Sequence, residues 1–96
     1  MGINELVEEL LRQSVLLRGI EVGRVVDVIL EPEHHAVIGY EVRCKDGRHR
    51  FLPRAAATND GGHIEIDSPF GLLDTDQLDF YRSRGLTLRT RKEPAA

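Results

Sequence analysis

The sequence predicts a mostly β fold, a small β-barrel of about six strands with a short helix at each end. Two long segments rich in β-branched residues, 22–30 and 36–45, are followed by a shorter one, 48–52. Turn-forming residues separate these segments, and the glycines Gly19 and Gly23 open the first. A barrel of about six strands is too narrow to enclose a ligand, because side chains fill its interior. We therefore expect any function to lie on its outside.

The chain of 96 residues is long enough for one domain and too short for two independent cores. We predict a single domain over residues 1–96, with the barrel core at about 14–67 and helices at about 3–13 and 75–84. The 13 basic and 16 acidic side chains give a net charge of -3, without the basic excess typical of nucleic-acid-binding domains.

Residues 3–13 have the periodicity of an amphipathic helix. Apolar side chains recur at helical spacing at Ile3, Leu6, Val7, Leu10 and Leu11. Asn4 suits the helix cap, and Glu8 with Arg12 forms a favourable i,i+4 pair. The apolar face must cover either the open end of the barrel or the same helix of a second subunit, and the sequence leaves both alternatives open.

Residues 14–18 predict a short strand, and residues 22–30 predict the strongest strand of the chain. With strict alternation, one face of the long strand carries Val26, Val28 and Leu30. The other face carries Asp27 between Val25 and Ile29. A strand that is apolar on both sides is usually buried on both, here by the barrel interior and a covering helix.

The segments that follow predict a hairpin. A turn at 31–35, which contains a proline, leads into the strand 36–45. The inward side of this strand carries Ile38, Tyr40, Val42 and Cys44. Asp46-Gly47 predicts a type I′ turn, since glycine supplies the positive φ that this turn requires, and 48–52 pairs back before Pro53. Cys44 is the single cysteine, which excludes an internal disulfide and a thiolate zinc site, and its phase predicts a small buried core residue.

The second half of the chain alternates turns with short elements. Residues 54–58 predict a connection with a helical turn, 59–62 predict another turn, and 63–67 predict a strand with Ile64 and Ile66 inward. The irregular segment 68–73 is expected to plug one end of the barrel with Phe70, Leu72 and Leu73.

Asp74 begins the second predicted helix, with Gln77 at the spacing of a capping box. Acidic residues come early in this helix and basic residues late, before Gly85 at its C-cap. Leu78 and Tyr81, with the adjacent Phe80, supply the predicted packing face. Residues 86–90 predict a last strand.

Three segments resemble the PRC-barrel family: GIEVGRVVDV at 19–28, VIGY at 37–40, and FLP at 51–53. That family takes its name from the photosynthetic reaction centre H subunit, and it also supplies the second domain of a bacterial ribosome maturation factor. The resemblance covers about residues 17–66 and implies a compact β-barrel used as an adaptor or partner-binding module, with no shared catalytic residues. The sequence departs from the family pattern by a trimmed segment at 45–48, and we expect neither a membrane helix nor a preceding barrel domain.

The residues that could bind a metal or a phosphate do not form a convincing site. His34 and His35, with Glu31 and Glu33 beside them and His49 or His63 as further ligands, suggest a metal, but adjacent side chains on an extended strand point apart. We expect a solvated polar turn there, with no metal and no cofactor. Glycines Gly19, Gly23 and Gly39 are expected to serve bending and close strand approach rather than phosphate binding.

Asp27 is the most unusual residue, an acid within an apolar strand. A buried carboxylate needs hydrogen bonds or a cation, and we expect turn amides or an arginine such as Arg24 or Arg50 to supply them. A role as a general base lacks a visible nucleophile or acid partner. With no catalytic triad, Cys-His pair or phosphate loop in the sequence, we expect no enzymatic activity.

The predicted function is that of a non-catalytic adaptor or protein-interaction module, with an unidentified protein or a second copy (a homodimer) as partner. The alternative is a ribosome- or RNA-associated assembly factor, based on the family and on two clusters of basic residues: Arg43, Lys45, Arg48, Arg50, Arg54; and Arg82, Arg84, Arg89, Arg91, Lys92. Metal-dependent hydrolysis with His34, His35 and His63 is the weakest hypothesis. Because no run of about 18 apolar residues occurs and the N-terminus is acidic, we expect a cytoplasmic protein without membrane insertion.

Overall fold

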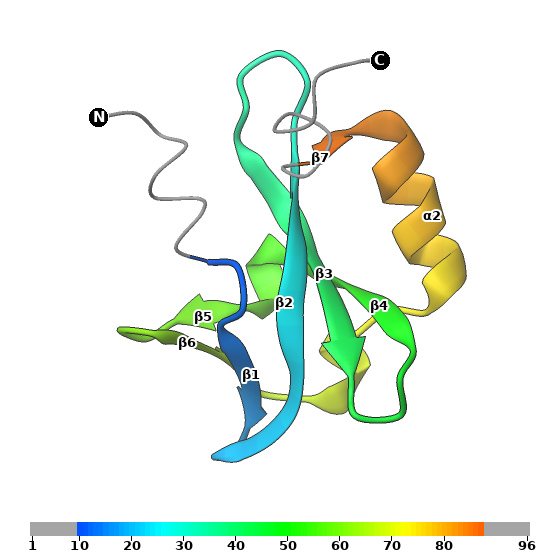
Figure 1. The fold of residues 1–96 in the computed structure, drawn as a ribbon. Helices are drawn as coiled ribbons and strands as arrows, with labels where there is room; N and C mark the ends of the chain where they lie inside the picture. The colour runs from blue at the N-terminus through cyan, green and yellow to red at the C-terminus, as the bar shows by residue number, and fades with distance from the viewer. Residues whose placement is uncertain (1–9, 88–96) are drawn as a thin grey trace.

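The computed structural model describes residues 10–87, which form one strongly curved sheet flanked by a single helix (Figure 1). The sheet order is β4-β3-β2-β1-β6-β5, with β7 paired to β2. The strands are β1 Ser14–Leu17, β2 Ile20–Leu30, β3 Val37–Cys44, β4 His49–Pro53, β5 Thr58–Asn59, β6 His63–Ile66 and β7 Leu86–Thr87. Two 3₁₀ turns, η1 Arg54–Ala56 and η2 Pro69–Gly71, and the helix α2 Thr75–Arg84 complete the described chain.

The mostly β prediction is confirmed, and each described strand lies within about two residues of its predicted place, except the two-residue β5, which was not predicted. The barrel is more open than predicted. Strands β4 and β5 stand at the two ends of the sheet order and, within residues 10–87, do not pair with each other. The chain passes from β4 to β5 through the turn η1. Because the two strands are not hydrogen-bonded to each other, the curved sheet is open at this point. Most neighbours are antiparallel, but β1 and β6 pair in parallel.

A β-bulge in β2 corrects the predicted alternation of its side chains. Val25 pairs with Val42 and Asp27 pairs with Glu41, so Val26 is an extra residue in β2. The extra residue reverses the phase of the strand. As a result Val25, and not Val26, joins Val28 and Leu30 in the core inside the curved sheet.

A second bulge corrects the phase of β3. Ile29 pairs with Gly39 while Leu30 pairs with Val37, so Ile38 is the extra residue. Ile38 therefore packs on the outer side of the sheet, against the cluster that contains Ile29. The prediction that Ile38 faces inward was wrong, whereas Tyr40, Val42 and Cys44 are confirmed in the inner core.

Helix α2 covers the outer face of the sheet beside β3 and β4 (Figure 1). Its Leu78 packs with Ile29 and Phe51 in a small outer core. The ring of Tyr81 stacks on Phe51 with 4.3 Å between the ring centroids. The predicted boundaries 75–84 of this helix are confirmed.

Two details of the predicted helix were wrong. The Asp74 side chain makes no capping hydrogen bond, and Gln77 is joined to Asp74 only through its backbone N–H, which donates to the Asp74 carbonyl at 3.0 Å. Phe80 does not belong to the packing face, since 45% of its surface is exposed. Gly85 is confirmed at the C-cap, but with an extended φ of -113° rather than a left-handed one.

The first predicted helix does not reach Gln13. Residues 10–12 form a turn, and Arg12 has a φ of 72°. The Arg12 N–H donates to the Val25 carbonyl at 2.7 Å, and the Val25 N–H donates to the Gln13 carbonyl at 3.0 Å. Pairing with β2 therefore replaces helical hydrogen bonds at this point. Leu10 is buried in the inner core, so it is not a free interface residue. The remainder of that helix and the predicted strand residues 88–90 lie outside the described residues.

The hairpin between β3 and β4 has a three-residue loop rather than the predicted type I′ turn. The Gly47 N–H donates to the Cys44 carbonyl at 2.9 Å, and the Cys44 N–H donates to the Arg48 carbonyl at 2.8 Å. Gly47 alone in this loop has a positive φ, 84°. These features match a type I turn followed by a glycine bulge, the usual form of a three-residue hairpin loop.

The free edge of β4 is covered by the chain that follows η2. Phe51 and Leu73 exchange two backbone hydrogen bonds, of 3.0 and 2.8 Å. The Thr75 hydroxyl donates to the His49 carbonyl at 2.8 Å. Pro53 ends the strand without an N–H to offer. At the other end of the sheet, β5 is only two residues long.

Gly39 offers a test of the packing between β3, β4 and α2. A Cβ at this position would lie 2.5 Å from the Leu52 carbonyl oxygen and 2.5 Å from the Phe51 ring. We expect Gly39→Ala to lower the free energy of unfolding by about 2–3 kcal/mol, because either β4 or the Phe51 ring must move. Urea denaturation followed by circular dichroism measures this change.

The matched control is Gly71→Ala, whose Cβ would meet only Ala56 at 3.3 Å and Leu52 at 3.9 Å. We expect less than half of the loss seen for Gly39→Ala. An equal loss for the two variants would contradict the proposed close approach at Gly39.

Candidate functional site

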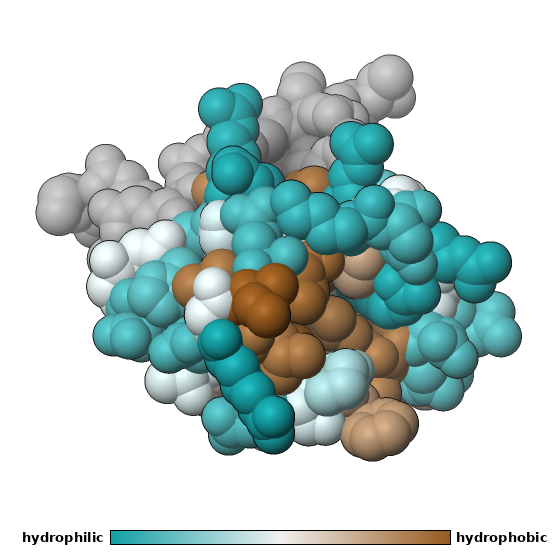
Figure 2. Space-filling view, turned by 90° about the horizontal axis from the view of Figure 1, so that it is seen from below, coloured by the Kyte–Doolittle hydropathy of each residue, from teal (hydrophilic) through white to brown (hydrophobic). Residues whose placement is uncertain are grey.

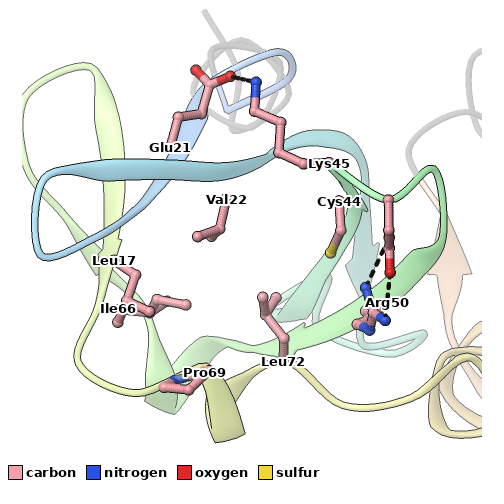
Figure 3. A pocket seen from close by; sticks show the side chains of 10 residues that line it. Leu17, Glu21, Val22, Cys44, Lys45, Arg50, Ile66, Pro69 and Leu72 are labelled. Atoms are coloured by element: carbon pink, nitrogen blue, oxygen red, sulfur yellow. Dashed lines mark hydrogen bonds and ion pairs between the residues drawn. The ribbon is translucent and has the colours of Figure 1, made fainter.

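The lower end of the curved sheet holds an apolar pocket of about 410 Å³, formed by the β1–β2 hairpin, the β3–β4 hairpin and the segment around η2 (Figure 3). Its lining residues are Leu17, Glu21, Val22, Cys44, Lys45, Asp46, Arg50, Ile66, Pro69 and Leu72. Val22 and Leu72 point into the space between the hairpins. Seen from below, apolar side chains form one continuous patch ringed by polar ones (Figure 2).

Two large apolar side chains beside this pocket are exposed. Ile20, next to the lining residues Glu21 and Val22, is 69% exposed, and Phe70, next to Pro69, is 87% exposed. The left-handed backbone of Arg18 and Gly19, with φ of 52° and 83°, turns the chain so that Ile20 comes at the hairpin tip. Exposed apolar side chains clustered around an apolar pocket are typical of an interaction site.

Phe70 does not plug the barrel, contrary to the sequence prediction. Ser68 fixes the turn instead, because its hydroxyl accepts a hydrogen bond from the Phe70 N–H at 3.1 Å. Within the same segment, Leu72 packs on the inner core and Leu73 on the outer one. The sequence carried no signal for this division, since all three side chains are large and apolar.

Two ion pairs stand at the rim of the pocket (Figure 3). Lys45 Nζ lies 2.6 Å from Glu21 Oε2, and the Ser14 hydroxyl donates to Glu21 Oε1 at 2.6 Å. These hydrogen bonds, that of Lys45 first, lower the pKa of Glu21 to about 2. Glu21 was not singled out from the sequence, where it is one acid among many.

The second rim pair joins Asp46 and Arg50. The Arg50 guanidinium donates to both carboxylate oxygens of Asp46, at 3.2 and 2.9 Å, and the Arg48 N–H donates to Asp46 at 2.9 Å. Arg50 first, and then this N–H, lower the pKa of Asp46 to about 2. Asp46 in turn raises the pKa of Arg50 above its usual value.

The charges around the pocket nearly balance. Arg18 and Asp67, both exposed, directly follow the paired residues Leu17 and Ile66 of β1 and β6. Together with the two ion pairs and Arg24, which lies 3.5 Å from Glu21, they give four positive and three negative side chains: Arg18, Arg24, Lys45 and Arg50 against Glu21, Asp46 and Asp67. The rim therefore carries only a small net positive charge.

A protein-family model of the PRC-barrel domain matches residues 4–73, which include every residue of the pocket. The chain belongs to the PRC-barrel family. The match extends on both sides of the segment 17–66 on which the resemblance was based and ends just before α2. A search of curated proteins found no match.

The outer face of this PRC-barrel domain holds two buried acids. Asp27 and Glu41 are cross-strand neighbours and are 2% and 3% exposed. Asp27 accepts a hydrogen bond from the Val28 N–H at 2.9 Å, an amide of its own strand rather than the expected turn amide. The arginines suggested as its partners are engaged elsewhere, Arg24 beside Glu21 at 3.5 Å and Arg50 with Asp46.

Glu41 links three elements of the domain, a role that the sequence did not indicate. Its Oε2 lies 2.5 Å from Nδ1 of His49 on β4, and its Oε1 lies 3.7 Å from Nε of Arg82 on α2. The second distance is that of an ion pair rather than of a hydrogen bond. These contacts tie the helix to the sheet, so we interpret Glu41 as a structural residue.

The predicted histidine set is not brought together. His34 groups with Glu31 and Glu33 in the turn after β2, with its Nδ1 2.9 Å from Glu31 Oε1. His63 belongs to a separate group with Asp60 and Glu65 at the β5–β6 turn. In each group the potential ligand atoms lie within 4.8 Å of one another, so each has the donor types of a weak cation site. His35 belongs to neither group.

The first predicted basic cluster is only partly brought together: Arg43 and Lys45 line one hollow with Arg12 and Arg24, and Arg43 is the cross-strand neighbour of Arg24. Arg43, Arg48 and Arg54 are exposed on β3, the hairpin loop and η1, while the charge of Arg50 is paired with Asp46. Arg82 contacts Glu41, and the Arg84 guanidinium lies 4.2 Å from the centre of the Phe80 ring. Arg89, Arg91 and Lys92 lie outside the described residues. Among the described residues, none of the helices has the length and apolarity needed to cross a membrane.

The rim pair of Glu21 and Lys45 predicts a defined pH dependence. Because the pKa of Glu21 falls from 4.5 to about 2 on folding, the ionised carboxylate stabilises the fold at and above pH 4.5. This contribution is lost as the pH falls from 4.5 towards 2. We expect Glu21→Gln to lower the urea midpoint of unfolding at pH 7 and to leave it unchanged near pH 2, measured by circular dichroism across the pH range.

The exposed Glu33, in the turn after β2, supplies the control for this measurement. We expect Glu33→Gln to leave the midpoint close to the wild-type value at both pH values. A Glu21→Gln effect of the same size at pH 7 and near pH 2 would show that the carboxylate charge is not what stabilises this hairpin.

Proposed function

We propose that this PRC-barrel domain is a non-catalytic protein-interaction module that docks its partner on the apolar pocket face. The observation that carries the proposal is the pocket of about 410 Å³ with two exposed apolar side chains beside it, Ile20 and Phe70. Exposing such side chains to water is unfavourable, and a docked partner removes that cost. The cytoplasmic location stays a prediction from the sequence.

The chemistry of the pocket favours a protein surface over a polyanion. Binding to nucleic acid depends on cations that neutralise phosphates. At this face the cations Lys45 and Arg50 are already paired with Glu21 and Asp46. The wall between the pairs is apolar, built from side chains such as Leu17, Val22 and Leu72, and such a surface suits aliphatic or aromatic side chains of a protein.

The same groups are poorly suited to catalysis. A general base works best when its pKa lies near the working pH. Glu21 and Asp46, with pKa values of about 2, are very weak bases at neutral pH. Cys44 lies in the wall of the pocket as a largely buried core residue. This supports a binding role for the pocket.

Site-specific photo-crosslinking in cells that naturally express the protein tests the proposal. A photoreactive phenylalanine analogue replaces Phe70 in one variant and Phe80 in the other. Phe80 is the matched control because it is also exposed but lies on α2. We expect a discrete polypeptide, identified by mass spectrometry, to be cross-linked from position 70 and not from position 80.

The sample is divided and treated with or without RNase before purification. Cross-links from position 80 alone, or cross-linked material that RNase removes, would contradict docking at the pocket. The RNase-sensitive result would favour the RNA-associated alternative and direct attention to Arg43, Arg48 and Arg54.

A further inference from the structure

We propose that a second hollow, on the outer face of the sheet, binds a small molecule that carries a phosphate monoester or a diphosphate group. This basic hollow has a volume of about 380 Å³ and shares part of its lining with the apolar pocket. Its charged lining residues are Arg12, Arg24, Arg43, Lys45 and Glu21. The proposal does not depend on a protein docked at the apolar pocket, because it concerns a different set of side chains.

Strands β2 and β3 place two arginines side by side at the basic hollow. Arg24 and Arg43 lie directly opposite each other in this antiparallel pair. The next pair along, Val25 and Val42, packs in the inner core, so alternation along the strands puts both arginines on the outer face. Like charges that lie opposite each other on neighbouring strands destabilise a sheet. A bound anion removes this repulsion, so the pair itself favours a negatively charged ligand.

A third arginine reaches the basic hollow from the turn before β1. The Arg12 N–H donates to the Val25 carbonyl at 2.7 Å, and the Val25 N–H donates to the Gln13 carbonyl at 3.0 Å. These hydrogen bonds hold Arg12 beside β2. Within residues 10–87, no carboxylate forms an ion pair with Arg12 or with Arg43, and both side chains are exposed. Both guanidinium groups are therefore available to a ligand.

Glu21, the acid among the described lining residues, is already held by its neighbours. Its Oε2 lies 2.6 Å from Lys45 Nζ, in the pair that Figure 3 shows at the rim of the apolar pocket, and its Oε1 accepts from the Ser14 hydroxyl at 2.6 Å. The Arg24 guanidinium lies 3.5 Å from Glu21, and 60% of the Arg24 side chain is exposed. Arg24 can therefore turn to a ligand without leaving Glu21 unpaired. With four cations and one acid, the hollow has a net positive charge.

The number of cations favours a phosphate group over a carboxylate. A phosphate monoester carries a charge of about −1.5 to −2 at neutral pH and has three strong acceptor oxygens. The planar guanidinium of arginine binds two such oxygens at once. A carboxylate has a single charge and only two oxygens, so one arginine is enough to bind it. Three arginines from three segments of the chain match a phosphate or a diphosphate better.

The rest of the lining favours a small molecule over a nucleic-acid strand. Sites for single-stranded nucleic acid combine a positive groove with aromatic side chains on which the bases stack. None of the described residues that line the basic hollow is aromatic. Its volume of about 380 Å³ lies within the range of small-molecule sites, about 300–1,000 Å³. Val26, the extra residue of the bulge in β2, adds an apolar wall for the part of the molecule that carries the phosphate.

An NMR titration of the full, ¹⁵N-labelled chain with sodium diphosphate tests the proposal, at low ionic strength because salt screens exposed charges. We expect saturable amide shifts centred on Gly23, Arg24 and Arg43, with a dissociation constant below about 10 mM. Arg43→Gln should weaken binding about tenfold, because a hydrogen bond to a charged group is lost. The matched control Arg54→Gln, which changes an exposed arginine on η1, should leave the dissociation constant unchanged.

Urea denaturation gives a second readout that needs no assigned resonances. A ligand that binds only the folded chain raises the midpoint of unfolding. We expect diphosphate to raise this midpoint for the wild type and for Arg54→Gln, and to raise it much less for Arg43→Gln. Circular dichroism should show both variants folded, since both side chains are exposed.

A third titration uses a single-stranded RNA of about twelve nucleotides without terminal phosphates. Binding of this RNA that is weaker than binding of diphosphate would support a small-molecule site. RNA that binds more tightly than diphosphate, and that Arg43→Gln and Arg54→Gln weaken equally, would overturn the proposal in favour of an extended nucleic-acid surface. Diphosphate that shifts no amide up to about 10 mM, or that loses equal affinity in the two variants, would also overturn it.

Discussion

The fold depends on the pairing of β2 with three other strands. It is the longest strand, and it pairs with β1, β3 and β7 along different parts of its length. A straight strand could not turn around the inner core and also support α2. The extra residue Val26 allows it, because a bulge bends the strand and reverses its phase. Val25 and Val28 therefore lie in the inner core, while Asp27 and Ile29 are buried on the outer side of the sheet.

The outer face and the pocket face of the domain differ in how far their side chains are buried. The outer face is closed by the stacked rings of Phe51 and Tyr81, and by Glu41, which contacts both His49 and Arg82. The buried Glu41 contacts groups of β4 and α2, although its Oε1 accepts no hydrogen bond, so we interpret it as holding the helix rather than as binding a ligand. The pocket face has the opposite character, with side chains fixed in position but left exposed to water. We therefore expect recognition at the pocket face, where apolar side chains remain exposed.

Most of the fold could be predicted from the sequence, because alternation and turn residues act over short distances. The strands near 22–30 and 36–45, the helix 75–84 and the buried Cys44 followed from such local patterns. The bulges could not be predicted, because the extra residues Val26 and Ile38 are apolar like their neighbours and leave no mark in the sequence pattern. The site was missed because its residues come from three distant segments, near Leu17, Cys44 and Ile66, that only the curved sheet brings together.

The covered edge of β4 has a consequence for how any partner can be recognised. An exposed strand edge can add a strand from another protein, with backbone hydrogen bonds supplying much of the affinity and little of the sequence selectivity. Here the edge groups of Phe51 are used by Leu73, the His49 carbonyl is used by Thr75, and Pro53 has no N–H. Strand addition at β4 is thus blocked. The covered edge also protects the domain against amyloid-like stacking of strands. A partner that docked beside β4 would therefore have to be recognised through side-chain contacts rather than through added backbone hydrogen bonds.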